Sequence, residues 1–117
     1  MDKEQLKEGV KYDADKERFD LISSNALMWL ARVYTYGAHK YADRNMEKGM
    51  KWGRIFAACM RHLWKFWWGE ELDEESGLPH LGHAMWCCAC LLDYSMYHKE
   101  FDDRSPYYKK SEDKADE

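Results

Sequence analysis

Long hydrophobic runs are missing from this 117-residue sequence. No stretch reaches the roughly 18 apolar residues that a membrane-spanning helix requires, so we expect no contact with a membrane. The N-terminal segment is rich in charge and leads into no apolar signal segment. The sequence therefore predicts a protein that stays in the cytoplasm.

Several motifs of well-known enzyme classes are also absent. There is no glycine-rich phosphate loop followed by Lys and Ser or Thr, no His-Asp dipeptide and no Gly-x-Ser-x-Gly element. These absences argue against P-loop enzymes, HD-type nucleotide hydrolases and hydrolases with a serine nucleophile elbow. Basic residues are not in excess, because 18 Lys and Arg are set against 22 Asp and Glu, for a net charge of −4. We therefore expect no nucleic-acid partner.

Large aromatic side chains, by contrast, are abundant, with six Trp and eight Tyr. A chain of this length has little interior for so many rings, so we expect some of them at a subunit interface or in a ligand pocket. The four cysteines all lie within apolar helical patterns, which favours reduced, buried thiols over disulfides. They are Cys59, Cys87, Cys88 and Cys90.

Apolar periodicity predicts an all-α protein with three main helices, near residues 25–37, 52–68 and 79–99. Gly37 and Gly69 are the expected ends of the first two helices, and Ser76 is the expected cap of the third. The second helix is predicted to bury an apolar stripe. The stripe consists of Trp52, Phe56, Met60, Leu63 and Trp67.

The third helix is apolar nearly all round over residues 84–92. Such a helix must be surrounded, and two other helices are too few to surround it. We therefore expect the three-helix bundle to be completed by oligomerisation, as a dimer or a tetramer. The sequence predicts one domain over residues 1–110 and a disordered charged tail over residues 111–117.

The most unusual stretch is acidic, with five carboxylates among residues 70–75, followed by His80 and His83. Glu70 and Asp73 are three residues apart, so on a helix end they would share a face. Oxygen ligands of this kind suit Mg²⁺ or Mn²⁺. Composition alone leaves open the alternative of a solvated acidic loop between two helices.

A basic loop over residues 38–51 offers a second set of candidate functional groups. Arg44 and Lys48 are candidates for contacts with substrate phosphates, and the alternative is a solvated surface. A third pattern, His80, His83, Cys87 and Cys90, would share one helix face. That pattern spreads over ~15 Å of helix axis, which argues against a tetrahedral zinc site.

A resemblance to a known family rests on an ordered series of short blocks within residues 11–95. The blocks are Lys11-Tyr12-Asp13, Lys16, Arg18-Phe19-Asp20-Leu21, Gly37-Ala38-His39-Lys40-Tyr41, Arg44-Asn45-Met46-Glu47-Lys48-Gly49, Arg61-His62-Leu63, Gly69-Glu70 and Glu75-Ser76-Gly77-Leu78-Pro79-His80-Leu81-Gly82-His83-Ala84. Through these blocks the chain resembles the phage dATP/dGTP diphosphohydrolases, the MazZ-type branch of the all-α MazG-like pyrophosphohydrolases.

The resemblance implies an oligomeric helical enzyme that uses Mg²⁺ or Mn²⁺ to cleave purine deoxynucleoside triphosphates, dGTP or dATP, into a monophosphate and pyrophosphate. It also implies a role in phage remodelling of the host nucleotide pool. Together with the spacing of the carboxylates, it makes Glu70, Asp73 and Glu75 the expected catalytic residues. The expected metal ligands are Glu70, Asp73, Glu75, Glu47 and His83. The expected substrate-binding residues are Lys40, Arg44, Asn45, Lys48, Trp52, Arg61 and His62.

Two departures from the family pattern leave the ligand assignment open. Only Glu70-x-x-Asp73 fits the paired acidic motifs of MazG-like sites, and Met46 and Cys87 stand where Trp and Asn are expected. Two other functions therefore stay under consideration. One is a non-catalytic helical phage protein that binds a host partner, which the aromatic excess would suit. The other is a hydrolase of a different phosphate ester.

Overall fold

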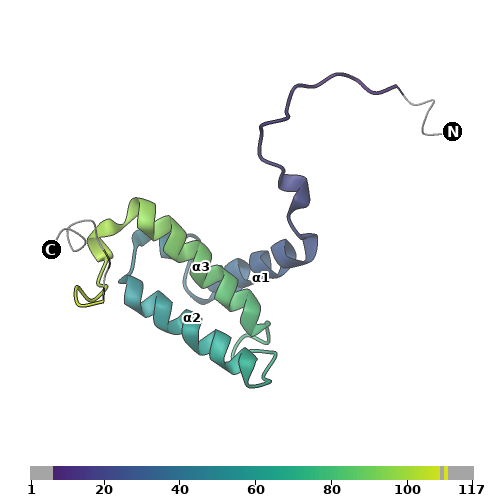
Figure 1. Ribbon diagram of the computed structural model, residues 1–117. Helices are drawn as coiled ribbons and strands as arrows, with labels where there is room; N and C mark the ends of the chain where they lie inside the picture. The colour runs from purple at the N-terminus through teal and green to yellow at the C-terminus, as the bar shows by residue number, and fades with distance from the viewer. Residues whose placement is uncertain (1–6, 109, 111–117) are drawn as a thin grey trace.

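The computed structural model describes residues 7–108 and residue 110, and these residues form an all-α structure (Figure 1). The three main helices are α1 (Ser24–Lys40), α2 (Trp52–Trp67) and α3 (His80–Tyr97). Short 3₁₀ helices are η2 (Phe19–Leu21), η3 (Asn45–Lys48) and η4 (Lys99–Phe101). The predicted all-α fold is thus confirmed. Oligomerisation stays a prediction, and the predicted tail over residues 111–117 lies outside the described residues.

Helices α2 and α3 lie side by side and run in opposite directions, and they share most of the core (Figure 1). The buried members of their apolar cluster are Trp52, Ile55, Cys59, Ala84, Cys87, Cys90 and Tyr94. Helix α1 packs on the start of α3, where a Cβ atom added at Gly82 would lie 3.3 Å from Val33 Cγ2. A Cβ atom at Gly82 would therefore crowd the Val33 side chain.

The face of α2 that packs on α3 is not the stripe that the sequence predicted. Of that stripe only Trp52 is buried. Trp67 is 78% exposed, and the other stripe members, Phe56, Met60 and Leu63, are exposed as well. Ile55 and Cys59 occupy the buried face instead. The prediction was wrong because periodicity identifies where large apolar side chains line up, and does not identify the surface that covers them. The exposed stripe is available for the predicted contact with a second copy.

Two of the three predicted helix boundaries need correction. Helix α1 runs through Gly37 to Lys40, because an internal glycine costs a helix only ~1 kcal/mol and does not by itself end it. Helix α3 begins at His80 with Pro79 as its N-cap residue, so Ser76 is not the cap. Helix α2 does end at Gly69 as predicted. There φ is +100°, Gly69 N–H donates to Phe66 O and Glu70 N–H donates to Lys65 O, the paired bonds of a Schellman cap.

Within the part of the chain that the structure describes, no helix combines the length and the apolar character needed to cross a bilayer.

Candidate functional site

The acidic stretch folds back on itself as a small ordered loop between α2 and α3. Asp73 N–H donates to Leu78 O over 2.8 Å, and His80 N–H donates to Glu71 O over 2.9 Å. Gly77, at φ +72°, donates its N–H to Asp73 O and closes the turn. These bonds carry Asp73 back beside the first turn of α3.

This loop geometry corrects the expectation that Glu70 and Asp73 share a helix face. The cap at Gly69 ends α2 before either residue, so helical spacing does not apply to them. Both side chains still reach the same cluster, from different sides. Glu70 contacts His80, and Asp73 contacts Ser76 and lies near His83.

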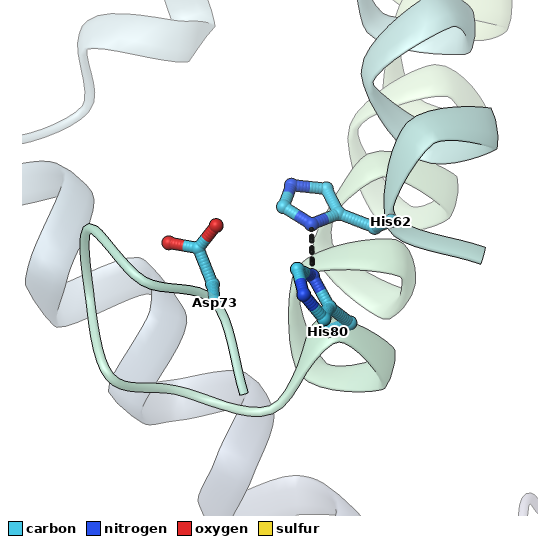
Figure 2. Close-up of side chains that lie close together, drawn as sticks. All are labelled: His62, Asp73 and His80. Carbon is cyan, nitrogen blue, oxygen red and sulfur yellow. Dashed lines mark hydrogen bonds between the residues drawn. The ribbon is translucent and has the colours of Figure 1, made fainter. Parts of the chain in front are cut away.

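Two histidines from neighbouring helices meet at the centre of the cluster. His62 Nδ1, from α2, lies 2.9 Å from His80 Nδ1, at the start of α3, and Figure 2 shows the Asp73 carboxylate facing the two rings from the loop. The His80 side chain is fully buried, and its Nε2 lies 2.5 Å from Glu70 Oε2. His83 stacks on His62 with ring centroids 4.6 Å apart. The cluster therefore draws on α2, the loop and α3.

Ser76 joins Asp73 to His83. Its N–H and its hydroxyl both donate to Asp73 Oδ2, each over 2.9 Å, and its oxygen lies 2.7 Å from His83 Nε2. Ser76 Oγ therefore lies between Asp73 Oδ2 and His83 Nε2 and links the two side chains.

Burial and neighbouring charges shift the titration of these groups. Burial, with smaller contributions from His83 and His80, lowers the pKa of His62 to about 4, so His62 is uncharged near neutral pH. Burial also lowers the pKa of His83, against the opposing attraction of Asp73. For Asp73, burial acts to raise the pKa, but the two hydrogen bonds from Ser76 and the nearby histidines outweigh it and lower the pKa. The cluster thus combines the uncharged His62 ring with an ionised Asp73 carboxylate.

Glu75, an expected ligand, points instead to α1. Its carboxylate forms an ion pair of 2.7 Å with Lys40, which lies 5.3 Å from the ring centroid of Tyr41. The hydrogen bond from Lys40 lowers the pKa of Glu75. The pair ties the end of α1 to the loop, so Lys40 stands at the border of the cluster.

The other predicted substrate residues from the basic loop lie at the far end of the α2–α3 pair. Residues Arg44 to Lys48 belong to or flank η3, and Tyr94 OH donates to Met46 O over 2.6 Å. His80 and Tyr94 are about 21 Å apart along α3 at ~1.5 Å per residue. Within one chain the structure therefore does not bring Arg44, Asn45, Glu47, Lys48 or Trp52 to the histidine cluster.

Two other predicted substrate residues, Trp52 and Arg61, differ in how much of the side chain is exposed to solvent. Trp52 is buried in the core, and its Nε1–H donates to His98 O over 3.0 Å. Arg61 is exposed on α2, next to His62. Glu47, an expected metal ligand, lies at the η3 end and forms an ion pair of 3.1 Å with Arg44.

Sequence reasoning missed the central role of His80, which it named after the acidic stretch and in the zinc pattern but did not assign to the site. Two members of that stripe, Cys87 and Cys90, pack in the core beside Ile55 and Cys59 instead. His62 was assigned to substrate, yet it offers a metal-ligating nitrogen beside His80. In the sequence, the signal for a site made by these two histidines is weak. It consists of one histidine in the second helix and another directly after Pro79.

The donor set fits a divalent cation. His62, Asp73 and His80 each offer one ligand atom, and these three atoms lie within 4.8 Å of one another. Glu70 and His83 surround them, and the contacts of His80 with Glu70 and of Asp73 with Ser76 fix the orientation of two of the three ligands. Two imidazole ligands and one carboxylate would leave a bound dication with net positive charge for an anionic substrate.

Comparison with known proteins by sequence finds one phage relative and one family that matches most of the chain. A protein named dATP/dGTP diphosphohydrolase from Salmonella phage PMBT28 is 34% identical over 76 residues, which cover 65% of this chain and 26% of that relative. The alignment thus spans about a quarter of the relative's length. No solved structure matches the chain. A family described as dATP/dGTP diphosphohydrolase, N-terminal, matches residues 7–104, and the chain therefore belongs to that family.

Proposed function

We propose that this protein hydrolyses purine deoxynucleoside triphosphates, dGTP or dATP, between the α and β phosphates, with Mg²⁺ or Mn²⁺ as the expected cofactor. The products would be a monophosphate and pyrophosphate, and the setting would be nucleotide-pool remodelling in the cytoplasm of a phage-infected host. The observation that carries the proposal is the match of residues 7–104 to the diphosphohydrolase family. The cluster around His62, Asp73 and His80 supports the proposal, because it offers candidate ligands for the divalent cation that this chemistry would use.

Each side chain of the cluster has a task in this proposal. Asp73, His62 and His80 would hold a divalent cation, which supplies charge neutralisation at the phosphates and activation of water. Ser76 keeps Asp73 and His83 in fixed positions through its three side-chain contacts. Glu70 holds the His80 ring, and Lys40 stands close enough to the loop to attract a phosphate once Glu75 releases it.

The basic loop can join this site only through a second copy of the chain. Arg44 and Lys48 are predicted to contact phosphate, Asn45 to bind substrate and Trp52 to flank the nucleotide. These residues lie at the η3 end, about 21 Å from the cluster as measured along α3. A homo-oligomer could bring the η3 end of one copy to the cluster of another. The exposed apolar stripe on α2 supplies a surface for such contact.

The test is a screen of the common ribo- and deoxyribonucleoside triphosphates with Mg²⁺ or Mn²⁺, with products identified by mass. We expect dGMP or dAMP with pyrophosphate, and little product from pyrimidine substrates. Release of orthophosphate alone, or of triphosphate, would contradict cleavage between the α and β phosphates. Turnover of another phosphate ester only would favour the alternative hydrolase.

A non-catalytic role remains the rival function, and a specific observation supports it. Phe56, Met60, Trp64 and Trp67 leave a large aromatic and apolar surface exposed on α2. A protein that binds a host partner through this surface would turn over no nucleotide under any metal condition while remaining folded. The same screen, with circular dichroism to confirm folding, therefore separates the two functions.

A further inference from the structure

Two imidazole nitrogens and one carboxylate converge beside the start of α3 (Figure 2). We propose that His62, His80 and Asp73 form a binding site for one first-row transition-metal dication such as Fe²⁺, Co²⁺, Ni²⁺ or Zn²⁺, in preference to Mg²⁺. The inference deepens the proposed function and rests on it for the role of the ion in hydrolysis. The binding itself can be measured without nucleotide.

The distance between the two imidazole nitrogens matches that between neighbouring ligands of one ion. Metal–nitrogen bonds are about 2.0–2.1 Å long, so two such bonds at a right angle place their nitrogens about 2.9 Å apart. His62 Nδ1 and His80 Nδ1 are 2.9 Å apart. A hydrogen bond between the rings would give the same distance, but it would not account for the approach of a carboxylate to both rings.

Glu70 determines which nitrogen of His80 faces His62. Its carboxylate lies 2.5 Å from Nε2, where it accepts the Nε2 proton, so Nδ1 presents a lone pair to His62. A carboxylate that holds the far nitrogen of an imidazole is the usual companion of a metal-bound histidine. Because the His80 side chain is fully buried, its ring has no solvent-facing alternative.

Asp73 is held as a ligand in a similar way. Both hydrogen bonds from Ser76 end on Oδ2. Among the residues that the structure describes, these are the hydrogen bonds of this carboxylate, so Oδ1 is available to an ion. A site with two imidazoles and one carboxylate binds iron, cobalt, nickel or zinc well, whereas Mg²⁺ prefers oxygen ligands and water. The ligand set therefore predicts the order of affinity.

The experiment titrates the full-length protein, first freed of metal with a chelator, with Co²⁺ and with Mg²⁺ by calorimetry. We expect one Co²⁺ per chain, bound at least about 100-fold more tightly than Mg²⁺. Bound Co²⁺ should give ligand-field absorption in the visible range, without the near-ultraviolet band of a cobalt–thiolate bond, since the cysteines lie outside the ligand set. Co²⁺ should also raise the melting temperature.

Variants assign the ligands. His62→Gln and Asp73→Asn should each weaken Co²⁺ binding at least about 10-fold, and Glu70→Gln should do so by roughly 10–100-fold. His98→Gln is the matched control, because His98 also contacts a carboxylate, Glu100, over 2.8 Å but lies at the other end of α3. It should bind Co²⁺ like the wild type. Circular dichroism confirms that each variant is folded.

Three results would overturn the inference: Co²⁺ bound no more tightly than Mg²⁺, Co²⁺ binding unchanged in both His62→Gln and Asp73→Asn, or a thiolate band in the cobalt spectrum. Nucleotide turnover is measured separately, so the two proposals fail in different ways. Tight Co²⁺ binding without turnover of any nucleotide would refute the proposed function alone. Turnover with Mg²⁺ in a protein that binds no Co²⁺ would refute this inference alone.

Discussion

The two ends of the α2–α3 pair are held together by different kinds of contact. At the η3 end, polar side chains bond to backbone carbonyls: Trp52 Nε1 to His98 O over 3.0 Å, and Tyr94 OH to Met46 O over 2.6 Å. At the loop end, ionisable side chains bond to one another, as His62 does to His80 and His80 to Glu70. These two contacts at the η3 end have fixed partners, and the ionisable pairs of that end, such as His98 with Glu100, are solvent-exposed. The contacts of the loop end are partly buried, and their partners depend on where protons sit.

This difference suits the η3 end to stabilising the fold and the loop end to binding a cation or exchanging protons. A backbone carbonyl neither titrates nor leaves, so contacts with it stabilise one arrangement. Ionisable side chains can exchange protons or accept a cation, and they cost stability when burial keeps them from water. We therefore expect changes at the η3 end to act on the free energy of unfolding, and changes at the loop end to act on metal binding and turnover.

The largest effect is expected at the η3 end, from Trp52→Ala. Removing a buried Trp typically lowers the free energy of unfolding by about 3–5 kcal/mol, and here the bond to His98 O is lost as well. Urea unfolding followed by circular dichroism measures the change. Trp67→Ala is the matched control, because Trp67 is 78% exposed and should change chain stability little. Equal losses in the two variants would mean that the exposed stripe is already buried in an oligomer.

Asp73→Asn tests the loop end with a change of almost no volume. The substitution removes the negative charge from the cluster but keeps an oxygen for Ser76. We expect kcat/KM for dGTP to fall at least about 100-fold, since loss of even an outer partner of a metal ligand costs 10–100-fold. Steady-state kinetics measures it, and a melting temperature near that of the wild type shows that the fold is intact. Full activity with Mg²⁺ would remove Asp73 from the ligand set.

The sequence predicted the loop end less completely than the fold, and the reason is physical. Helix existence follows from local periodicity, and Gly69 ended α2 as expected because its positive φ suits a glycine. The meeting of His62 with His80 depends on a turn closed by Gly77 and Ser76, which no periodicity describes. The buried face of α2 was mispredicted for a related reason, because periodicity does not say which of two apolar faces meets a partner.

The pH dependence of stability provides a third test, again at the loop end. The pKa of His62 is lowered from 6.5 in the unfolded chain to about 4 in the folded protein. Between these values the unfolded chain binds the extra proton, so metal-free protein loses stability as the pH falls from about 6.5 to 4. His62→Gln removes this contribution, so its melting temperature should fall less than that of the wild type over that range. Parallel curves for the two proteins would show that His62 does not titrate in this way.

Tyr94→Phe gives a smaller effect at the η3 end. The variant keeps the buried ring but loses the hydroxyl, which leaves the carbonyl of Met46 without that donor. An unmade buried hydrogen bond costs about 1–2 kcal/mol of unfolding free energy. Chemical denaturation measures the loss, with the exposed Tyr97→Phe as the control. Metal affinity at the loop end should not change in either variant, and a change would mean that the two ends are coupled.

The smallest effect on stability is expected from Lys40→Ala. This change at the loop end separates an effect on substrate binding from an effect on stability. The ion pair between Lys40 and Glu75 is largely solvent-exposed, so its loss should change the free energy of unfolding by less than about 1 kcal/mol. If Lys40 contacts a substrate phosphate as predicted, KM for dGTP should nevertheless rise about 10-fold, because a charge-assisted contact is lost.

Glu75→Gln is the control for the pair, since it breaks the same ion pair but leaves the lysine free to bind phosphate. A raised KM in Lys40→Ala but not in Glu75→Gln would assign Lys40 to the substrate. Equal kinetics in both variants would leave the pair as a link between α1 and the loop, and loss of turnover in Glu75→Gln alone would return Glu75 to the metal ligands.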